Sequence, residues 1–172
     1  MKNVALVTGG TGFVGFHLCT WLMKNNYHVI ATGRKNENLP PCNEIYTNKL
    51  SEFPHEKHSD IHVCFHLAAN NNTLDSDIDS MMESNVNTPI TLFNNLLQQN
   101  NCKNFVYASS CSIYGNQNAP FVEDKTKPSP LNPYAVSKLE FEKCATKFAD
   151  DNSVRAIGLR YSNVYGPKEG HK

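Results

Sequence analysis

The sequence has no surplus of charge of either sign, because 16 lysines and arginines are matched by 16 aspartates and glutamates. No net field therefore attracts the chain to nucleic acid or to an anionic membrane surface, and any recognition of an anion must be local. No apolar run approaches the roughly 18 residues that a membrane span requires. No small-residue cleavage site follows the apolar start of the chain, so a secretory signal is not predicted. We expect a cytoplasmic protein with neither nucleic acid nor membrane as a partner.

The sequence also lacks the spacing of a disulfide framework or of a zinc site. Its six cysteines include no Cys-x-x-Cys pair and lie mostly in apolar segments, as reduced thiols do. His62, Cys64 and His66 alternate onto one face of a predicted strand, and His55 and His58 are near in sequence. A buried parallel strand has both faces covered by helices, which leaves little room for a metal. We predict no metal site and expect His66 to be a hydrogen-bonded core residue.

Strand and helix patterns alternate along the 172 residues, without repeats or an internal linker. This length suits one domain with a core, covering residues 1–172. The alternation predicts an α/β fold, a doubly wound parallel sheet of the Rossmann type with strand order 3-2-1-4-5-6 and a ligand at the carboxyl ends of the strands. The predicted strands span 4–7, 28–32, 44–47, 61–69, 103–109 and 154–159, and the predicted helices carry Val14, Leu18 and Leu22 or span 83–99 and 134–149.

Three glycines, Gly9, Gly12 and Gly15, follow the first strand at three-residue spacing. Such a turn brings a pyrophosphate close to backbone N–H groups at a helix N-terminus, where the helix dipole favours negative charge. A side chain at Gly9 or Gly12 would hold the phosphates off, and Gly15 would let the helix pack tightly on the strand. The pattern predicts a dinucleotide site.

The end of the second strand predicts which cofactor is bound. NAD sites usually place there a carboxylate that accepts the ribose 2′-OH, whereas this chain has Gly33 followed by Arg34. A guanidinium can bind a 2′-phosphate bidentately, so the sequence favours NADP over NAD. Lys35 is the weaker phosphate ligand, and Arg34 as a solvated loop residue is the alternative. Asn48, after the third strand, is placed to contact the adenine edge.

Tyr134 and Lys138 stand four residues apart on a predicted helix and so project from one face. Bringing a tyrosine from its usual pKa near 10 to about 7 requires roughly 4 kcal/mol. A lysine ammonium at about 4 Å supplies about that much at an effective dielectric constant near 20. The pair is therefore a candidate for proton exchange with a substrate hydroxyl, with Ser110 as a hydrogen-bonding partner of the same oxygen. An exposed helix pair is the alternative.

Five motifs, at residues 8–15, 66–69, 109–115, 134–138 and 160–167, occur in the order found in the extended short-chain dehydrogenase/reductase family, which this chain resembles over its whole length. The resemblance implies a nucleotide-sugar-modifying enzyme with Ser110, Tyr134 and Lys138 as its catalytic triad. It implies substrate contacts from Ser110, Ser112 and Asn163. Beyond the glycines, Arg34 and Asn48, the expected cofactor-binding residues are Phe13, Val14, Leu67, Ala68, Ala69, Asn85, Ser109, Tyr134, Lys138 and Tyr161.

Within the family, the residues favour an epimerase, an isomerase of carbohydrate metabolism. Sugar dehydratases carry an acid pair where this chain has Cys111 and Ser112. Residues 163–172 resemble the corresponding run of the ADP-glycero-manno-heptose 6-epimerases, which implies NADP as cofactor and Lys172 as a second acid/base. A UDP-hexose 4-epimerase, or another nucleotide-sugar oxidoreductase of the family, is the alternative.

Members of the family continue beyond the point that matches Lys172, with a further strand and a smaller substrate-binding domain. We therefore expect this chain to be the N-terminal part of a longer enzyme, with the C-terminal substrate domain missing. The alternative of another class is a truncated, noncatalytic NADP-binding module. The resemblance also implies a homodimer or larger homo-oligomer formed through the helices at 83–99 and 134–149.

Overall fold

The computed structural model describes residues 3–34, 39–167 and 169. Its six strands form one parallel sheet in the order β3-β2-β1-β4-β5-β6, which confirms the predicted topology. The fourth strand is shorter than predicted, whereas the sixth extends two residues further. The strands are β1 (Val4–Thr8), β2 (His28–Thr32), β3 (Glu44–Tyr46), β4 (Val63–His66), β5 (Asn104–Ser110) and β6 (Arg155–Tyr161).

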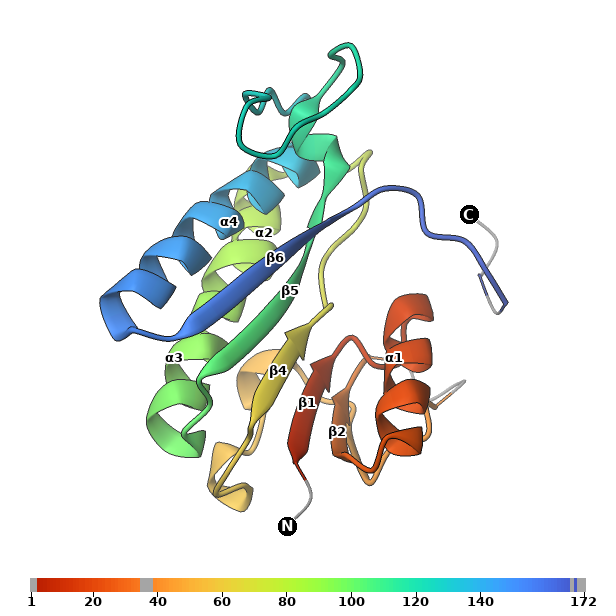
Figure 1. Ribbon diagram of the computed structural model, residues 1–172, viewed down its shortest axis with the longest axis vertical. Coiled ribbons are helices and arrows are strands. Elements are labelled where there is room, and N and C mark those ends of the chain that lie inside the picture. Colours follow the sequence, from red (N-terminus) through yellow and green to blue (C-terminus); the bar gives the residue numbers. More distant parts are fainter. Residues whose placement is uncertain (1–2, 35–38, 168, 170–172) are drawn as a thin grey trace.

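Helices pack on both faces of the sheet (Figure 1). One face carries α1 (Phe13–Lys24), whose buried Cys19 and Leu22 pack with alternate residues of β1 and β2. The other face carries α3 (Thr88–Asn100) and α4 (Pro133–Asn152), which bury a core rich in phenylalanine against β4 and β5. This core includes Phe93, Phe105, Phe141 and Phe148.

In the described part of the chain no helix is long and apolar enough to cross a membrane.

The helix predicted over 83–99 is longer and consists of three segments, α2 (Ile78–Met82), a π-helical turn η3 (Glu83–Asn87) and α3. It begins earlier because the Asp77 carboxylate accepts a hydrogen bond from the Ser80 N–H at 3.0 Å and so caps the first turn. Pro89 stands in the first turn of α3, directly after the π turn. Since proline has no N–H, it cannot donate the regular bond to the carbonyl four residues back.

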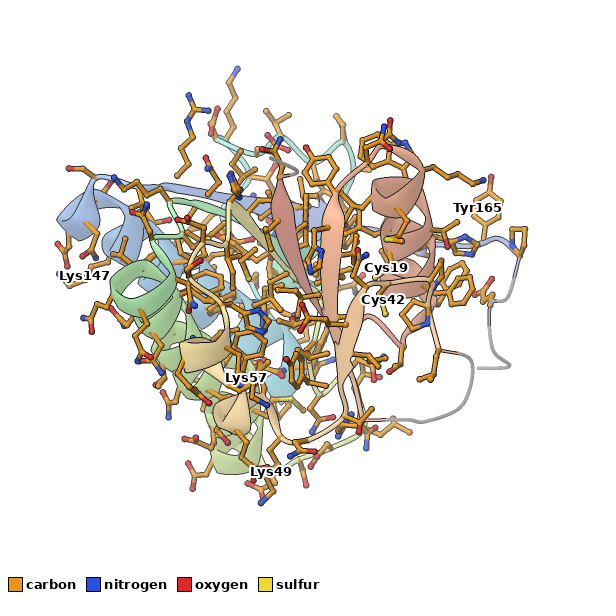
Figure 2. The ribbon with its side chains drawn as sticks, turned by 90° about the horizontal axis from the view of Figure 1, so that it is seen from below. Cys19, Cys42, Lys49, Lys57, Lys147 and Tyr165 are labelled. Carbon is orange, nitrogen blue, oxygen red and sulfur yellow. The ribbon has the colours of Figure 1, made fainter. Side chains whose placement is uncertain are left out.

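The segment 50–59, for which no helix was predicted, contains two single 3-10 turns, η1 (Leu50–Glu52) and η2 (His55–Lys57). All six cysteines are free thiols. Cys19 of α1 and Cys42 lie beside each other (Figure 2), and burial, followed by the neighbouring Cys42, raises the pKa of Cys19 to about 12. The protonated thiol is therefore strongly favoured over the thiolate at this site.

The α1 face of the sheet is covered over β1 and β2 only. Within the described ranges, α1 contacts these two strands, and no helix packs on β5 and β6 from that side. Ile157 is 53% exposed and Leu159 is 39% exposed on β6 as a result. The predicted double winding is thus complete on the α3 and α4 face and partial on the α1 face.

Candidate cofactor and catalytic site

The glycine turn between β1 and α1 is built by close backbone approach. Gly9 has a φ of +69°, and a Cβ there would lie 2.8 Å from the Ala68 amide nitrogen. Gly12 is the N-cap of α1 and donates its N–H to the Gly9 carbonyl at 2.9 Å. The N–H groups of Phe13 and Val14, in the first turn of α1, have no intrahelical acceptor, as at any helix start. The turn therefore offers donors and space at a helix N-terminus, which fits a pyrophosphate.

Gly15 allows a close approach of α1 to the end of β1. A Cβ at Gly15 would lie 2.2 Å from the Gly9 carbonyl oxygen and 2.8 Å from the Gly10 Cα. Gly9 directly follows Thr8, the last residue of β1. The missing side chain therefore permits the tight packing predicted for Gly15, and the contact is made at the glycine turn that follows the strand.

Thr8, which the sequence did not single out, connects the glycine turn to the end of β4. Its Oγ1 accepts hydrogen bonds from the Leu67 and Ala68 N–H groups, each at 3.2 Å, and lies 2.8 Å from His66 Nδ1. Since the hydroxyl accepts from two amides, it donates to Nδ1, which places the His66 proton on Nε2. The Leu67 N–H also donates to the Thr8 carbonyl at 3.2 Å, so Thr8 holds the start of the loop after β4 with both its backbone and its side chain. The strand β4 ends at His66 and not at Ala69 as predicted.

His66 is a hydrogen-bonded core residue, as predicted, and only 2% exposed. Burial, with a smaller contribution from the charge of Lys138, lowers its pKa to about 3. The imidazole therefore stays neutral at neutral pH. The register pairs Thr8 with His66 on neighbouring strands, and this pairing is the signal that could have identified Thr8.

Asn85 lies in the π turn and is 2% exposed. Its amide NH2 donates to the Asn70 carbonyl at 2.9 Å and to Ser137 Oγ at 3.0 Å, and its Oδ1 accepts from the Asn70 N–H at 2.7 Å. The side chain thus ties the loop after β4 to helix α4. The expected cofactor contact near Asn85 stays a prediction, and through Asn70 the residue shapes the loop that contains Ala68 and Ala69.

Ser110, Tyr134 and Lys138 meet at the carboxyl end of β5. Ser110 is the last residue of β5 and caps the 3-10 turn η4 (Cys111–Tyr114) by accepting the Ser112 N–H at 3.1 Å. Tyr134 lies in the first turn of α4, which Asn132 caps by accepting the Ala135 N–H at 2.8 Å. The Ser110 side chain lies near enough to the Tyr134 phenol to act on its pKa, in the lowering direction.

The electrostatics of this group differ from the prediction. Burial raises the pKa of Tyr134 above its ordinary value, and Ser110 only opposes that shift. Lys138, 3% exposed, donates from Nζ to the Ala108 carbonyl at 2.9 Å, and Nζ lies 5.7 Å from the Tyr134 ring centroid. Burial lowers the pKa of Lys138 to about 8. The prediction that Lys138 alone lowers the pKa of the phenol is therefore wrong in this structure, because the ammonium is directed to a carbonyl.

Ser112 has a feature typical of a ligand contact. In the parts of the chain that the structure describes, Ser112 Oγ and His58 Nε2 are the only buried side-chain polar atoms without a hydrogen-bond partner. A buried hydroxyl without a partner costs free energy that a bound ligand can recover. Ser112 lies two residues from Ser110 in η4, so this hydroxyl belongs to the same part of the site.

At the end of β2, Gly33 packs under Thr11, and Arg34 is exposed. A Cβ at Gly33 would lie 2.2 Å from Thr11 Oγ1, so a carboxylate could not stand there without moving Thr11. The weaker phosphate candidate Lys35 lies outside the described residues, as does Lys172.

The remaining predicted site residues differ in their exposure and in their hydrogen-bond partners. Asn48 and Asn163 are exposed, and Tyr161 is half-buried. Ser109, 3% exposed, donates its hydroxyl to Glu142 on the α4 side of the sheet, so only its backbone is available to a cofactor on the Ser110 side. A hollow of about 430 Å³ on the surface of α4, lined by residues from Leu139 to Asp151, includes none of the predicted residues. The candidate site rests on its side chains and turns, not on a cavity.

The comparisons with known proteins agree with this geometry. Residues 5–172 match the NAD dependent epimerase/dehydratase family. The ADP-L-glycero-D-manno-heptose-6-epimerase of Cupriavidus pinatubonensis is 35% identical over 178 residues, covering 97% of this chain and 53% of the relative. The chain thus spans about half the length of this relative.

Solved structures with the same fold include epimerases that hold substrate or cofactor. UDP-glucose 4-epimerase of Thermotoga maritima, solved with UDP-glucose, superposes with a TM-score of 0.87 at 28% identity, covering 97% of this chain and 58% of that one. UDP-glucuronic acid 4-epimerase of Bacillus cereus, in complex with NAD, superposes with a TM-score of 0.84 at 27% identity, covering 96% and 58%.

Proposed function

Because this chain belongs to the NAD-dependent epimerase/dehydratase family, we propose that it is the cofactor-binding part of a nucleotide-sugar epimerase that uses NADP. The observation that carries the proposal is the convergence of Ser110, Tyr134 and Lys138 at the same sheet edge as the glycine turn. In parallel α/β sheets a ligand binds at this edge, where the strand order reverses between β1 and β4.

The residues present fit a dinucleotide. The space over Gly9 and Gly12, together with the helix start at Phe13, would hold the pyrophosphate. Arg34 would bind a 2′-phosphate, which the absence of a carboxylate at Gly33 favours. When bound, the nicotinamide cofactor supplies a hydride acceptor that can return the hydride to the opposite face of the sugar carbon.

In this proposal Tyr134 takes the proton of a substrate hydroxyl as its carbon is oxidised and returns the proton when the carbon is reduced. Ser110, which lies beside the phenol, would bind the same substrate oxygen. Ser112 and Asn163 would bind the sugar, and Lys172 would act as a second acid/base. Lys138 supplies positive charge, which stabilises the phenolate in the step where Tyr134 has lost its proton.

The proposed substrate is an ADP-glycero-manno-heptose, supported by the 35% identical relative that carries that name. A UDP-hexose is the second candidate, supported by the high TM-score to the enzyme solved with UDP-glucose. To distinguish the two candidates, this chain is fused to the part of the heptose epimerase relative that it does not span. Turnover of each sugar nucleotide by the fusion protein is then measured. Turnover of the heptose alone supports the first candidate, and turnover of UDP-glucose alone supports the second.

Calorimetric titration of the 172-residue chain with NADPH and separately with NADH tests the cofactor. Tighter binding of NADPH supports the proposal, whereas equal or tighter binding of NADH contradicts it. The fusion protein with the added part of the relative tests the alternative. If it binds NADPH but turns over neither sugar nucleotide, the result favours the noncatalytic NADP-binding module instead. Size-exclusion chromatography tests the proposed dimer through α3 and α4.

A further inference from the structure

A partly buried ion pair, which the proposed function does not use, connects α4 to the end of β6. Arg160 Nε donates to Glu142 Oε1 at 3.0 Å, and Arg160 Nη2 donates to Glu142 Oε2 at 2.8 Å. The side chains of Arg160 and Glu142 are 22% and 13% exposed. Two parallel N–H···O bonds of this kind fix the orientation of both groups, which a single contact to a lysine would not do.

The same pair binds two further segments. Ser109 Oγ at the end of β5 donates to Glu142 Oε1, and Arg160 Nη1 donates to the Tyr114 hydroxyl at 2.6 Å. Four segments are therefore joined through one carboxylate and one guanidinium: the ends of β5 and β6, the turn η4, and α4. We refer to Ser109, Tyr114, Glu142 and Arg160 as the clamp.

Each member of the clamp lies next to a residue of the candidate site. Ser109 precedes Ser110, and Tyr114 ends the turn that Ser110 caps. Glu142 follows Lys138 by four residues on α4 and therefore lies one turn further along the same face. Arg160 precedes Tyr161 at the end of β6.

We propose that Glu142 and Arg160 are positioning residues, which hold the end of β5 against α4 and thereby fix Ser110, on β5, relative to Tyr134, on α4. The inference rests on the proposed function, in which the placement of Ser110 beside Tyr134 orients the acid/base group. Neither residue exchanges a proton with substrate; both act through Ser110 and Tyr134. Proton transfer depends steeply on such placement, since a displacement of about 1 Å can cost about a hundredfold in rate.

The test is the titration of Tyr134 in the 172-residue chain, followed by NMR of tyrosine labelled with ¹³C at Cζ. The chain has seven tyrosines, and Tyr134→Phe assigns the signal. Ser110 lowers the pKa of Tyr134, so we expect Ser110→Ala to raise that pKa. Glu142→Gln and Arg160→Lys should raise it too, because Ser110 loses its support.

The matched control is Asp151→Asn, which removes an ion pair with Lys147 at 2.7 Å on the exposed part of the same helix. This variant should leave the Tyr134 titration unchanged. Arg160→Lys keeps the charge and loses the bidentate geometry, so recovery of the wild-type titration in this variant would show that charge alone suffices and would overturn the inference.

The outcomes separate this inference from the proposed function. If Ser110→Ala raises the pKa of Tyr134 and folded Glu142→Gln does not, the positioning role is overturned and the proposed function stands. If Ser110→Ala leaves the Tyr134 titration unchanged, Ser110 does not act on Tyr134. That result contradicts the role of Ser110 in the proposed function and overturns the inference as well. Should Glu142→Gln not fold, Tyr114→Phe removes one hydrogen bond of the clamp and keeps the ring. An upward shift in Tyr114→Phe supports the inference, and an unchanged titration overturns it.

Discussion

Replacing Gly15 by alanine tests how tightly α1 packs on the glycine turn. The added Cβ would lie 2.2 Å from the Gly9 carbonyl oxygen and 2.8 Å from the Gly10 Cα, and both are backbone atoms that cannot rotate away. Overpacking of this kind costs about 1–3 kcal/mol. Alanine gains about 1 kcal/mol over glycine inside a helix. Because the backbone itself must move, we expect a steric cost in the upper half of that range, about 2–3 kcal/mol, which leaves a net loss of about 1–2 kcal/mol in the free energy of unfolding.

Thermal melting measures this loss. For a domain of this size 1 kcal/mol corresponds to about 2–4 °C, so the melting temperature should fall by about 2–8 °C. NADPH binding should also weaken, because the displaced turn carries the phosphate donors. Gly12→Ala is the matched control for the melting temperature alone, since its Cβ would meet only the Gly9 oxygen at 3.1 Å and its φ of −82° suits alanine. A Gly15→Ala protein as stable as the wild type would refute the argument, because helix propensity alone would then decide the sign.

Three further predictions concern the cofactor, the acid/base group and the pH dependence of stability. Arg34→Ala should weaken NADPH binding much more than NADH binding in calorimetry, and equal losses would make Arg34 a simple loop residue. In this chain fused to the part of the heptose epimerase relative that it does not span, Tyr134→Phe should abolish hydride transfer with cofactor affinity nearly intact, and unchanged turnover would remove Tyr134 from the mechanism. Burial lowers the pKa of His66 to about 3, so only the unfolded chain binds a proton between pH 6.5 and about 3. The stability due to neutral His66 is present above pH 6.5 and is lost by up to about 1.4 kcal/mol per pH unit as the pH falls. Denaturant melts at several pH values should show this slope in the wild type and not in His66→Gln. Identical slopes in the two proteins would contradict the burial argument.

The strand order could be predicted because each strand has an apolar run of its own, and right-handed crossovers permit few arrangements of six such runs. The site could be placed for the same reason, since Gly9, Ser110 and Tyr161 all follow or end strands of one parallel sheet. Local spacing also sufficed for the pair of Tyr134 and Lys138, which one helix carries.

Contacts between distant segments could not be predicted from these patterns. The loop after β4 is held by the Thr8 hydroxyl, which lies 59 positions earlier than the Leu67 amide that it binds. The start of α2 depends on the Asp77 cap, in a polar stretch that is typical of a loop. Which backbone atoms Gly15 approaches depends on where α1 lies relative to its own preceding turn. Each of these is a matter of ångströms between backbone atoms, to which hydrophobic periodicity is insensitive.

The direction of the Tyr134 pKa shift shows what the chemistry of this site requires. A phenol needs about 4 kcal/mol of stabilisation of its anion to titrate near pH 7 instead of 10. One hydrogen bond, such as one from Ser110, contributes about 1 kcal/mol, and burial acts in the opposite direction. Most of the stabilisation must therefore come from positive charge near the phenol oxygen. Lys138 keeps that charge only below its lowered pKa of about 8, so above pH 8 its contribution to an acid/base role of Tyr134 declines.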